Sequence, residues 1–325
     1  MQVFTDLDQV PDGFGPSAVT IGNFDGVHRG HQAVLGRLVR LAHADGLAAV
    51  AVTFDPHPAV VHRPQAAPEL LTGLADRLDL LAATGLDAVL VIRYSLGFAA
   101  QGPQEFVTRY LTEGLGARSV VVGHDVRFGR DNAGTLATMV ELGGEHGFEV
   151  VAVDDVGECL PESAGARQRW SSSAARALLA EGDAAQAADV LGRPHRVRGT
   201  VVHGDARGRE LGFPTANLGG IAGMVPADGV YAGWLRRPSL AAEEPGHPDV
   251  RLPAAISIGT NPTFDGVERR VEAYVLDRTD LDLYDEEVVL ELVEHLRPTL
   301  RFDGIEPLVK QMHDDVARAR SVLVA

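Results

Sequence analysis

The first half of the chain alternates short apolar stretches with segments of helical periodicity, and this alternation strongly limits its fold. The apolar stretches are rich in valine and isoleucine and have the length of single β-strands. Near-continuous apolar strands that alternate with helices are typical of a parallel sheet covered on both faces. We therefore predict a doubly wound α/β domain. Its expected strands are 18–21, 48–54, 88–92, 119–122 and 149–153, and its expected helices are 32–44, 70–84, 103–113 and 135–146.

The second half has a different pattern, in which short apolar or alternating stretches are separated by turn residues. Several short strands with turns between them indicate an all-β antiparallel barrel or sandwich. The expected strands are 199–202, 229–235, 252–258, 271–276 and 288–295. We therefore predict two domains, residues 1–186 and residues 187–325.

The segments around these patterns carry predictions of their own. The stretch 154–169 is polar and irregular, and 192–199 resembles a linker because it combines glycine, proline and a change of charge. The stretch 236–250 is acidic and contains proline, so we expect an exposed hairpin loop. A final helix is predicted to open with a capping box of Asp303 and Glu306. Its expected apolar face consists of Ile305, Leu308, Val309, Met312, Val316 and Leu323.

Composition limits the partners and the compartment. The formal net charge is −16, and such a surface repels nucleic acid, so we expect no nucleic-acid partner. No apolar run reaches the roughly 18 residues of a membrane span, and the N-terminus lacks a secretory signal, so we expect no membrane association. Cys159 is the only cysteine, which excludes an intramolecular disulfide and fits a reducing cytoplasm. We predict a cytoplasmic protein, and a weak homo-oligomer stays open.

The scarcity of lysine removes two common kinds of phosphate site. Lys310 is the only lysine among 29 basic residues. The P-loop motif needs a lysine after its glycine, and protein kinases need a lysine on a strand. Phosphate chemistry in this chain must therefore use arginine, histidine, backbone amides and a divalent metal.

The segment 22–31, Gly-Asn-Phe-Asp-Gly-Val-His-Arg-Gly-His, follows a predicted strand and leads into a predicted helix. Free backbone N–H groups and the helix dipole at such a helix start attract anions such as phosphate. His28 and His31 could alternatively be surface or capping histidines, or part of a zinc site, although no third ligand is evident. The complete segment matches the HxGH signature of nucleotidyltransferases.

Three further segments of the first half contain candidate ligand contacts. Phe54 lies in a proline-stiffened loop after a buried strand, and ligands bind at such strand ends in parallel sheets. In the loop 123–129, Phe128 is a candidate aromatic wall and Asp125 a candidate hydrogen-bond acceptor. A serine-led helix follows at 171–176, where the serines either cap the helix or help Arg176 to bind a polyphosphate. The candidate loops are 22–31, 55–58, 94–98 and 123–132.

In the second half, a glycine-rich segment at 204–217 ends in Thr215 and Asn217. These residues lie two apart, so their oxygens share one face of a strand and suit magnesium. Glu272 lies between apolar neighbours on a probable strand and would face away from the core. Such a glutamate could be merely solvated, or it could act as a general base beside a metal-bound triphosphate.

Together these blocks resemble the prokaryotic family of bifunctional riboflavin kinases/FMN adenylyltransferases, also called FAD synthetases. The resemblance runs from about residue 18 to residue 320. It implies a Rossmann-like nucleotidyltransferase domain followed by a Greek-key barrel with a C-terminal helix. The blocks are GNFDGVHRGH at 22–31, TFDPHP at 53–58, GHDVRFG at 123–129, SSSAAR at 171–176, GRELGFPTAN at 208–217, DGVYAG at 228–233, SIGTNPTF at 257–264, VEAYVLD at 271–277, LYDEE at 283–287 and LRPTLRF at 296–302.

For the barrel domain, the resemblance implies phosphorylation of riboflavin by ATP. Thr215 and Asn217 would bind Mg²⁺ or another divalent cation, and Glu272 would deprotonate the terminal ribityl hydroxyl. Nucleotide contacts would come from Gly204, Gly208, Arg209 and Gly212.

For the α/β domain, the resemblance implies transfer of AMP from a second ATP to FMN, which gives FAD and pyrophosphate. His28 and His31 would stabilise the charge that develops during transfer. Contacts to this ATP would come from Gly22, Asn23, Phe24, Asp25, Ser171, Ser172, Ser173 and Arg176. Flavin contacts would come from Phe54, Asp125, Phe128 and Arg297.

The chain departs from the family pattern in details of the expected flavin contacts, with Val126 in place of an aromatic residue and Tyr274 where histidine is frequent. Three alternatives stay open. The chain could be a riboflavin kinase with a degenerate N-terminal half, although intact His28, His31 and Arg176 argue against this. It could be a flavin-sensing protein without turnover, against which intact Glu272, Thr215 and Asn217 argue. It could also be an adenylyltransferase for another cofactor precursor, which would leave the barrel half without a function.

Overall fold

The computed structural model describes residues 1–153, 170–204, 207–260 and 269–324. The irregular stretch predicted at 154–169, which contains Cys159, and the block residues 261–264 lie outside these ranges. The chain divides into two compact units. The N-terminal unit consists of Met1–Glu69 and Leu74–Trp170, and the C-terminal unit consists of Leu70–Gly73 and Ser171–Ala325. The predicted domain boundary at 186/187 stays a prediction.

The N-terminal unit contains a six-stranded, all-parallel sheet in the order β1-β4-β3-β2-β5-β6. The five predicted strands are confirmed, and the short edge strand β1 is an addition. Because β3 and β4 extend the sheet on one side of β2 while β5 and β6 extend it on the other, the strand order reverses between β2 and β5. The strands are β1 Gln2–Phe4, β2 Ser17–Ile21, β3 Ala48–Asp55, β4 Ala88–Arg93, β5 Ala117–Gly123 and β6 Glu149–Val153.

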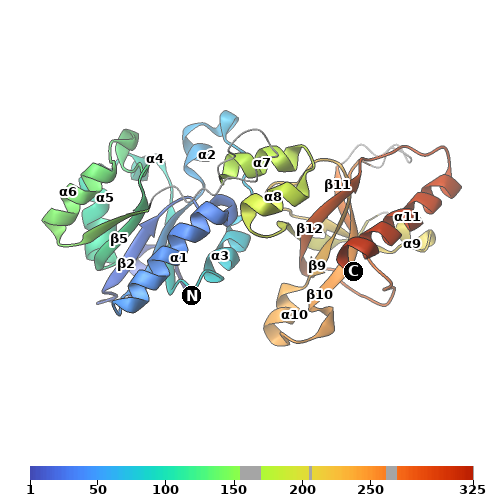
Figure 1. The fold of residues 1–325 in the computed structure, drawn as a ribbon, viewed down its shortest axis with the longest axis horizontal. Helices are drawn as coiled ribbons and strands as arrows, with labels where there is room; N and C mark the ends of the chain where they lie inside the picture. The colour runs from blue at the N-terminus through green and yellow to red at the C-terminus, as the bar shows by residue number, and fades with distance from the viewer. Residues whose placement is uncertain (154–169, 205–206, 261–268, 325) are drawn as a thin grey trace. The chain divides into compact units, whose positions relative to one another are not determined.

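Helices cover both faces of this sheet (Figure 1). On β2 and β3, alanines face α1 Arg29–Ala44 and α3 Leu74–Ala82, whereas valines face the opposite helices. The opposite layer consists of α5 Pro103–Phe106, the π-helical segment Val107–Gly114 and α6 Leu136–His146. Small residues on one face and larger ones on the other let both helix layers pack closely. Short helical segments at the strand ends are Asp25–Val27, α2 Pro58–His62 and α4 Leu96–Ala99.

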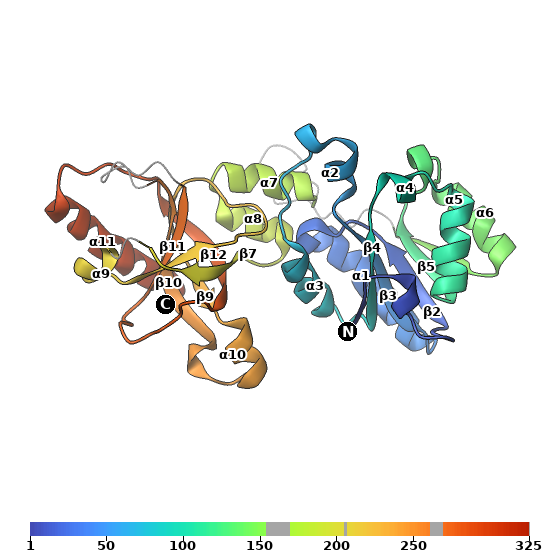
Figure 2. The same ribbon diagram turned by 180° about the vertical axis from the view of Figure 1, so that it is seen from behind.

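The C-terminal unit begins with α7 Ser172–Ala180 and α8 Ala184–Leu191 and continues into a closed six-stranded antiparallel barrel (Figure 2). Strands β9, β10 and β11 pair in sequence, and β12 returns beside β9, which is a Greek-key connection. The helix α11 Ile305–Leu323 packs on the outside of the barrel. The strands are β7 His195–Val202, β8 Thr215–Gly219, β9 Gly229–Arg236, β10 Arg251–Gly259, β11 Arg270–Val275 and β12 Glu287–Arg297.

Two local predictions in this unit are wrong. The expected linker is partly strand, because β7 begins at His195 and alternates buried and half-buried residues. The expected hairpin loop at 236–250 does connect the antiparallel strands β9 and β10, and its residues are exposed or half-buried, but it also contains α10 Pro238–Glu243 and a short 3-10 helix, Pro248–Val250.

The predicted capping box of the last helix is also absent. The N-cap is Gly304 at φ 125°, and no side chain caps this end. Glu306 is therefore the second residue of the helix, and Pro307 occupies the third position, which a capping box requires for its acid. Ile305 is 55% exposed and does not belong to the buried face.

Candidate functional sites

The HxGH segment lies where the strand order of the N-terminal sheet reverses. After β2, Phe24 adopts a left-handed backbone conformation at φ 49°, and the helix α1 starts with His28 as its N-cap. The Nδ1 atom of His28 accepts a hydrogen bond from the backbone N–H of His31 at 3.3 Å. The predicted position of the two histidines at a helix start is confirmed.

Three aromatic rings pack together at this helix start. The rings of His28 and His31 stack with centroids 3.6 Å apart, and the ring of Phe24 meets His31 edge-on at 5.3 Å. A Cβ atom on residue 22 would lie 2.9 Å from the Phe24 ring, so only glycine fits at that position. Burial lowers the pKa of His31 well below its usual 6.5, and the nearby His28 lowers it further. His31 is therefore a neutral imidazole at pH 7.

Acidification is expected to destabilise the N-terminal unit through His31. Below about pH 6.5 an unfolded His31 takes up a proton, whereas the folded side chain stays neutral because its pKa is lowered. Stability is thus lost as the pH falls below about 6.5, by up to about 1.4 kcal/mol per pH unit. Thermal unfolding at about pH 7.5 and about pH 5.5 measures this loss. His31→Phe keeps an aromatic ring but cannot titrate, so this variant should lose less stability than the wild type between the two pH values. An equal loss in the two proteins would show that other groups cause the effect.

A cavity of about 210 Å³ lies at the carboxyl ends of β2, β3, β4 and β5. Four of the predicted site residues line this cavity: Gly22, Asn23, Phe54 and Phe128. The predicted residues Phe24 and Asp25 do not line it and are buried, and Asp125 does not line it and is exposed. Sequence reasoning named the loop 94–98 but not its residues. The cavity is also lined by three further aromatic residues, Tyr94, Phe98 and Phe106. Together with Phe54 and Phe128 they form a chain of ring contacts in the order Phe54, Tyr94, Phe98, Phe106, Phe128. The cavity is therefore an aromatic slot suited to a flat ring system.

Sequence reasoning missed Arg77, whose side chain on α3 is 1% exposed. Its guanidinium donates to the carbonyl oxygens of Asn23 at 3.2 Å and Phe54 at 3.0 Å, and to Oδ1 of Asp55 at 3.4 Å. Arg77 thus ties the loop after β2 to the end of β3, and both segments line the aromatic cavity. A long-range contact of this kind has no local signal in the sequence.

Replacing Arg77 by methionine is expected to destabilise the N-terminal unit by about 3 kcal/mol, since each hydrogen bond from a buried charged group contributes roughly 1.5–3 kcal/mol. Denaturant unfolding measures the change. Arg37→Met, at an exposed position on α1, is the matched control. Equal stability of the two variants would show that the Arg77 contacts do not hold the loops.

The predicted serine-led helix is confirmed as α7, which belongs to the C-terminal unit. Ser171 is the N-cap, and its hydroxyl accepts a hydrogen bond from the N–H of Ala174 at 3.1 Å. Ser172 and Ser173 open the helix, and Arg176 lies one turn further on. The capping function is therefore present, and phosphate binding by these residues stays a prediction.

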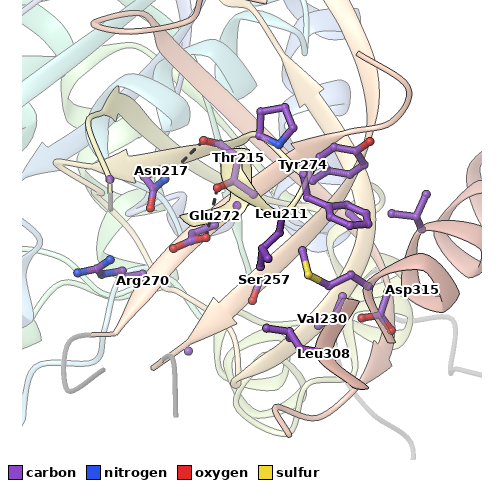
Figure 3. A pocket seen from close by; sticks show the side chains of 18 of the residues that line it. Leu211, Thr215, Asn217, Val230, Ser257, Arg270, Glu272, Tyr274, Leu308 and Asp315 are labelled. Atoms are coloured by element: carbon purple, nitrogen blue, oxygen red, sulfur yellow. Dashed lines mark hydrogen bonds between the residues drawn. The ribbon is translucent and has the colours of Figure 1, made fainter. Parts of the chain in front are cut away.

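The C-terminal unit has a cavity of about 220 Å³ on the outside of its barrel, covered by α11. The barrel interior is filled by alternate side chains such as Val271 and Ala273, so Glu272 faces outward as predicted. Glu272 pairs across the sheet with Asn217 of β8, and its Oε2 atom accepts a hydrogen bond from the Thr215 hydroxyl at 3.4 Å (Figure 3). The structure thus brings the three predicted polar residues together.

The two ends of this cavity differ in chemistry. Gly204, Gly208 and Arg209 line it together with the three polar residues, whereas Gly212 is exposed and does not. A Cβ atom on residue 204 would lie 2.5 Å from the Asn217 amide, so a larger residue at this position would displace the Asn217 side chain. Away from the polar end, Leu308 of α11 and Val230 both line the cavity (Figure 3). The cavity therefore has a polar end and an apolar end.

Arg297 lines this cavity and is held by Asp315 of α11, which sequence reasoning did not identify. Its Nε and Nη2 atoms donate to the Asp315 carboxylate at 2.7–3.0 Å, and Nη1 donates to the carbonyl of Pro298. The Asp315 side chain is 5% exposed. This ion pair joins α11 to β12 and fixes the direction of the guanidinium.

The fold defines a two-unit protein in which a doubly wound α/β unit and an antiparallel barrel each have a cavity suited to ligand binding. Family models described as FAD synthetase and riboflavin kinase match residues 12–162 and 191–323. The chain belongs to the family of bifunctional riboflavin kinases/FMN adenylyltransferases.

Several proteins resemble it over nearly their whole length. The bifunctional riboflavin kinase/FMN adenylyltransferase of Escherichia coli K12 is 35% identical over 93% of this chain and 91% of its own. The enzyme of the same name from Listeria monocytogenes is 35% identical over 98% of this chain and 93% of its own. A crystal structure from Streptococcus pneumoniae, described as a macrolide-efflux protein, has a TM-score of 0.82 at 30% identity and covers 98% of each chain. Within the described residues of the present chain, no helix has the length and apolar character of a membrane span.

Proposed function

We propose that the chain phosphorylates riboflavin to FMN in its C-terminal unit and adenylylates FMN to FAD in its N-terminal unit, with one ATP used in each step. The observation that carries this proposal is the outward-facing Glu272 beside Thr215 and Asn217, in a cavity whose other end is apolar. A cavity of this kind suits a ligand that has a flat apolar ring and a polar chain with a hydroxyl group that must be deprotonated.

In the kinase step, Glu272 accepts the proton of the terminal ribityl hydroxyl while that oxygen attacks the γ-phosphorus of ATP, and ADP leaves. The hydrogen bond from Thr215 orients the carboxylate. The ring system of riboflavin occupies the apolar end, against Leu308 and Met312 of α11.

The donor atoms at the polar end fit Mg²⁺. The Thr215 hydroxyl and the Asn217 side-chain carbonyl are hard oxygen ligands, and Mg²⁺ usually takes few protein ligands together with substrate phosphates. When bound, the ion neutralises charge on the transferred phosphoryl group.

In the adenylyltransferase step, a phosphate oxygen of FMN attacks the α-phosphorus of the second ATP, and pyrophosphate leaves. Neutral His31 and its stacked partner His28 lie at the first turn of α1, where backbone N–H groups also point toward an anion. They stabilise charge by positioned hydrogen bonds, without a covalent intermediate. The aromatic slot that includes Phe54 and Phe128 receives the flavin ring.

Several finer points stay predictions. Binding of ATP phosphates by Ser172, Ser173 and Arg176 rests on the family resemblance. The same holds for flavin binding by Asp125, a cytoplasmic location and the absence of nucleic-acid partners.

Incubation of the purified protein with riboflavin, ATP and Mg²⁺, followed by separation of the flavins, tests the proposal. FMN should appear first and FAD second. FMN without FAD would indicate a degenerate N-terminal unit, and bound flavin without any product would indicate a sensing protein. Failure to use FMN together with transfer of AMP to another acceptor would favour a different adenylyltransferase.

A further inference from the structure

The connection between β9 and β10, residues 237–250, received no function from its sequence. We call it the insert. It contains α10 and a short 3-10 helix, and its two ends meet through a hydrogen bond from the N–H of Arg237 to the carbonyl of Val250 at 3.0 Å. The insert thus leaves the barrel and returns to it at the same place, and this bond between its two ends does not explain the function of its side chains.

Two bidentate ion pairs join the insert to a second loop, residues 277–286, which connects β11 to β12. The Nε and Nη2 atoms of Arg237 donate to the two carboxylate oxygens of Glu286 at 2.8 and 2.9 Å. The Nη1 and Nη2 atoms of Arg278 donate to the two oxygens of Asp249 at 2.6 and 3.0 Å. Bidentate pairs of this type fix direction as well as distance.

These pairs are bidentate and partly covered, which distinguishes them from single-contact surface ion pairs. The side chains of Arg237, Glu286 and Asp249 are each less than one-fifth exposed. The hydrogen bonds that Arg237 donates to Glu286 raise the pKa of Arg237, and the hydrogen bonds that Asp249 accepts from Arg278 lower the pKa of Asp249. The insert therefore holds the 277–286 loop near its beginning, at Arg278, and at its end, at Glu286.

The loop held in this way carries Tyr284, which lines the kinase cavity. The Tyr284 ring stacks on His203 with centroids 4.0 Å apart, and its hydroxyl accepts a hydrogen bond from Nη2 of Arg209 at 3.3 Å. Arg209 belongs to the glycine-rich segment at the polar end of the cavity. Tyr284 is thus part of the same end of the cavity as the proposed nucleotide contacts.

We propose that the insert braces the 277–286 loop so that Tyr284 stays at the nucleotide end of the kinase cavity. Arg237 and Asp249 are then positioning residues for ATP binding in the kinase step. This inference rests on the proposed kinase function of the C-terminal unit. It explains why two charged residues of the insert, Arg237 and Asp249, form ion pairs with the two ends of the 277–286 loop.

Steady-state kinetics of Arg237→Gln and Asp249→Asn test the inference, with Glu243→Gln on the exposed face of the insert as the matched control. Each test variant should raise the KM for ATP in FMN formation about tenfold, which corresponds to about 1.4 kcal/mol. The kcat, the KM for riboflavin and the conversion of FMN to FAD should change less than about twofold. The double variant Arg237→Glu with Glu286→Arg restores the pair with its charges exchanged and should recover most of the ATP affinity.

An unchanged KM for ATP in both test variants would overturn the inference, provided that the wild type makes FMN. A parallel fall of kcat, riboflavin affinity and FAD formation would also overturn it, because that result describes a general stabilising role. If the wild type makes no FMN, the proposed kinase function itself fails, and this outcome is distinct from the other two.

Discussion

The Glu272→Gln protein is expected to form FMN at least about 10²-fold more slowly than the wild type, since general base catalysis contributes about 10²–10⁴-fold. Glutamine has the shape of glutamate and can still accept a hydrogen bond from Thr215, so the cavity is preserved. It cannot take up the proton of the ribityl hydroxyl. The variant should nevertheless convert added FMN to FAD at the wild-type rate, because Glu272 belongs to the barrel and the HxGH segment belongs to the N-terminal sheet.

Chromatographic separation of riboflavin, FMN and FAD over time measures both steps in one sample. Glu294→Gln, an exposed glutamate of β12 that does not line the cavity, is the matched control and should behave as the wild type. Unchanged FMN formation in Glu272→Gln would remove this carboxylate from the mechanism. Loss of both activities would show that the two units do not function independently.

The second large effect is expected from His31→Ala, which should slow FAD formation by about 10²–10³-fold and leave FMN formation unchanged. Removal of one positioned donor to a developing negative charge has this magnitude in other enzymes. The variant also loses the stacking of His31 on His28 and its edge contact with Phe24. The effect should therefore appear mainly in kcat, because geometry at the reacting phosphate is lost.

FMN and ATP supplied to the His31→Ala protein test this directly. Its thermal unfolding reports whether the N-terminal unit is folded, and its riboflavin kinase activity reports the same for the C-terminal unit. His43→Ala is a suitable control, because His43 lies on the same helix at its exposed end and pairs with Asp87. An FAD yield equal to that of the wild type would exclude His31 from the catalytic residues.

Local patterns predicted much of the fold. Four of the five predicted strands, β2 to β5, are central in the N-terminal sheet and largely apolar on both faces, so their signal survives in any packing. Alternation along β11 was sufficient to place Glu272 outside the barrel, because the side-chain period of a strand is two. The position of the HxGH segment could also be predicted from the sequence, since its turn residues, histidines and helix start are contiguous in the chain.

The predictions that failed depended on distant or competing features. Gly304 and Pro307 changed the start of the last helix, although its acids had the composition of a capping box. The first part of β7 was mistaken for a linker because its outward residues there are Arg196 and Arg198, which are paired by glutamates of β12. Arg77 and Asp315 act on loops and strands far from them in sequence, so no local window contains their function.

The barrel of the C-terminal unit keeps its interior for packing and uses its outer surface, under α11, for chemistry. Stability and ligand selectivity are thereby assigned to opposite faces of the same strands. Substitutions on α11, such as those at Leu308 or Met312, can reshape the apolar end of the cavity without touching the barrel core. Under the proposed function, such substitutions would change which flavin analogues the kinase accepts and would leave the barrel core unchanged.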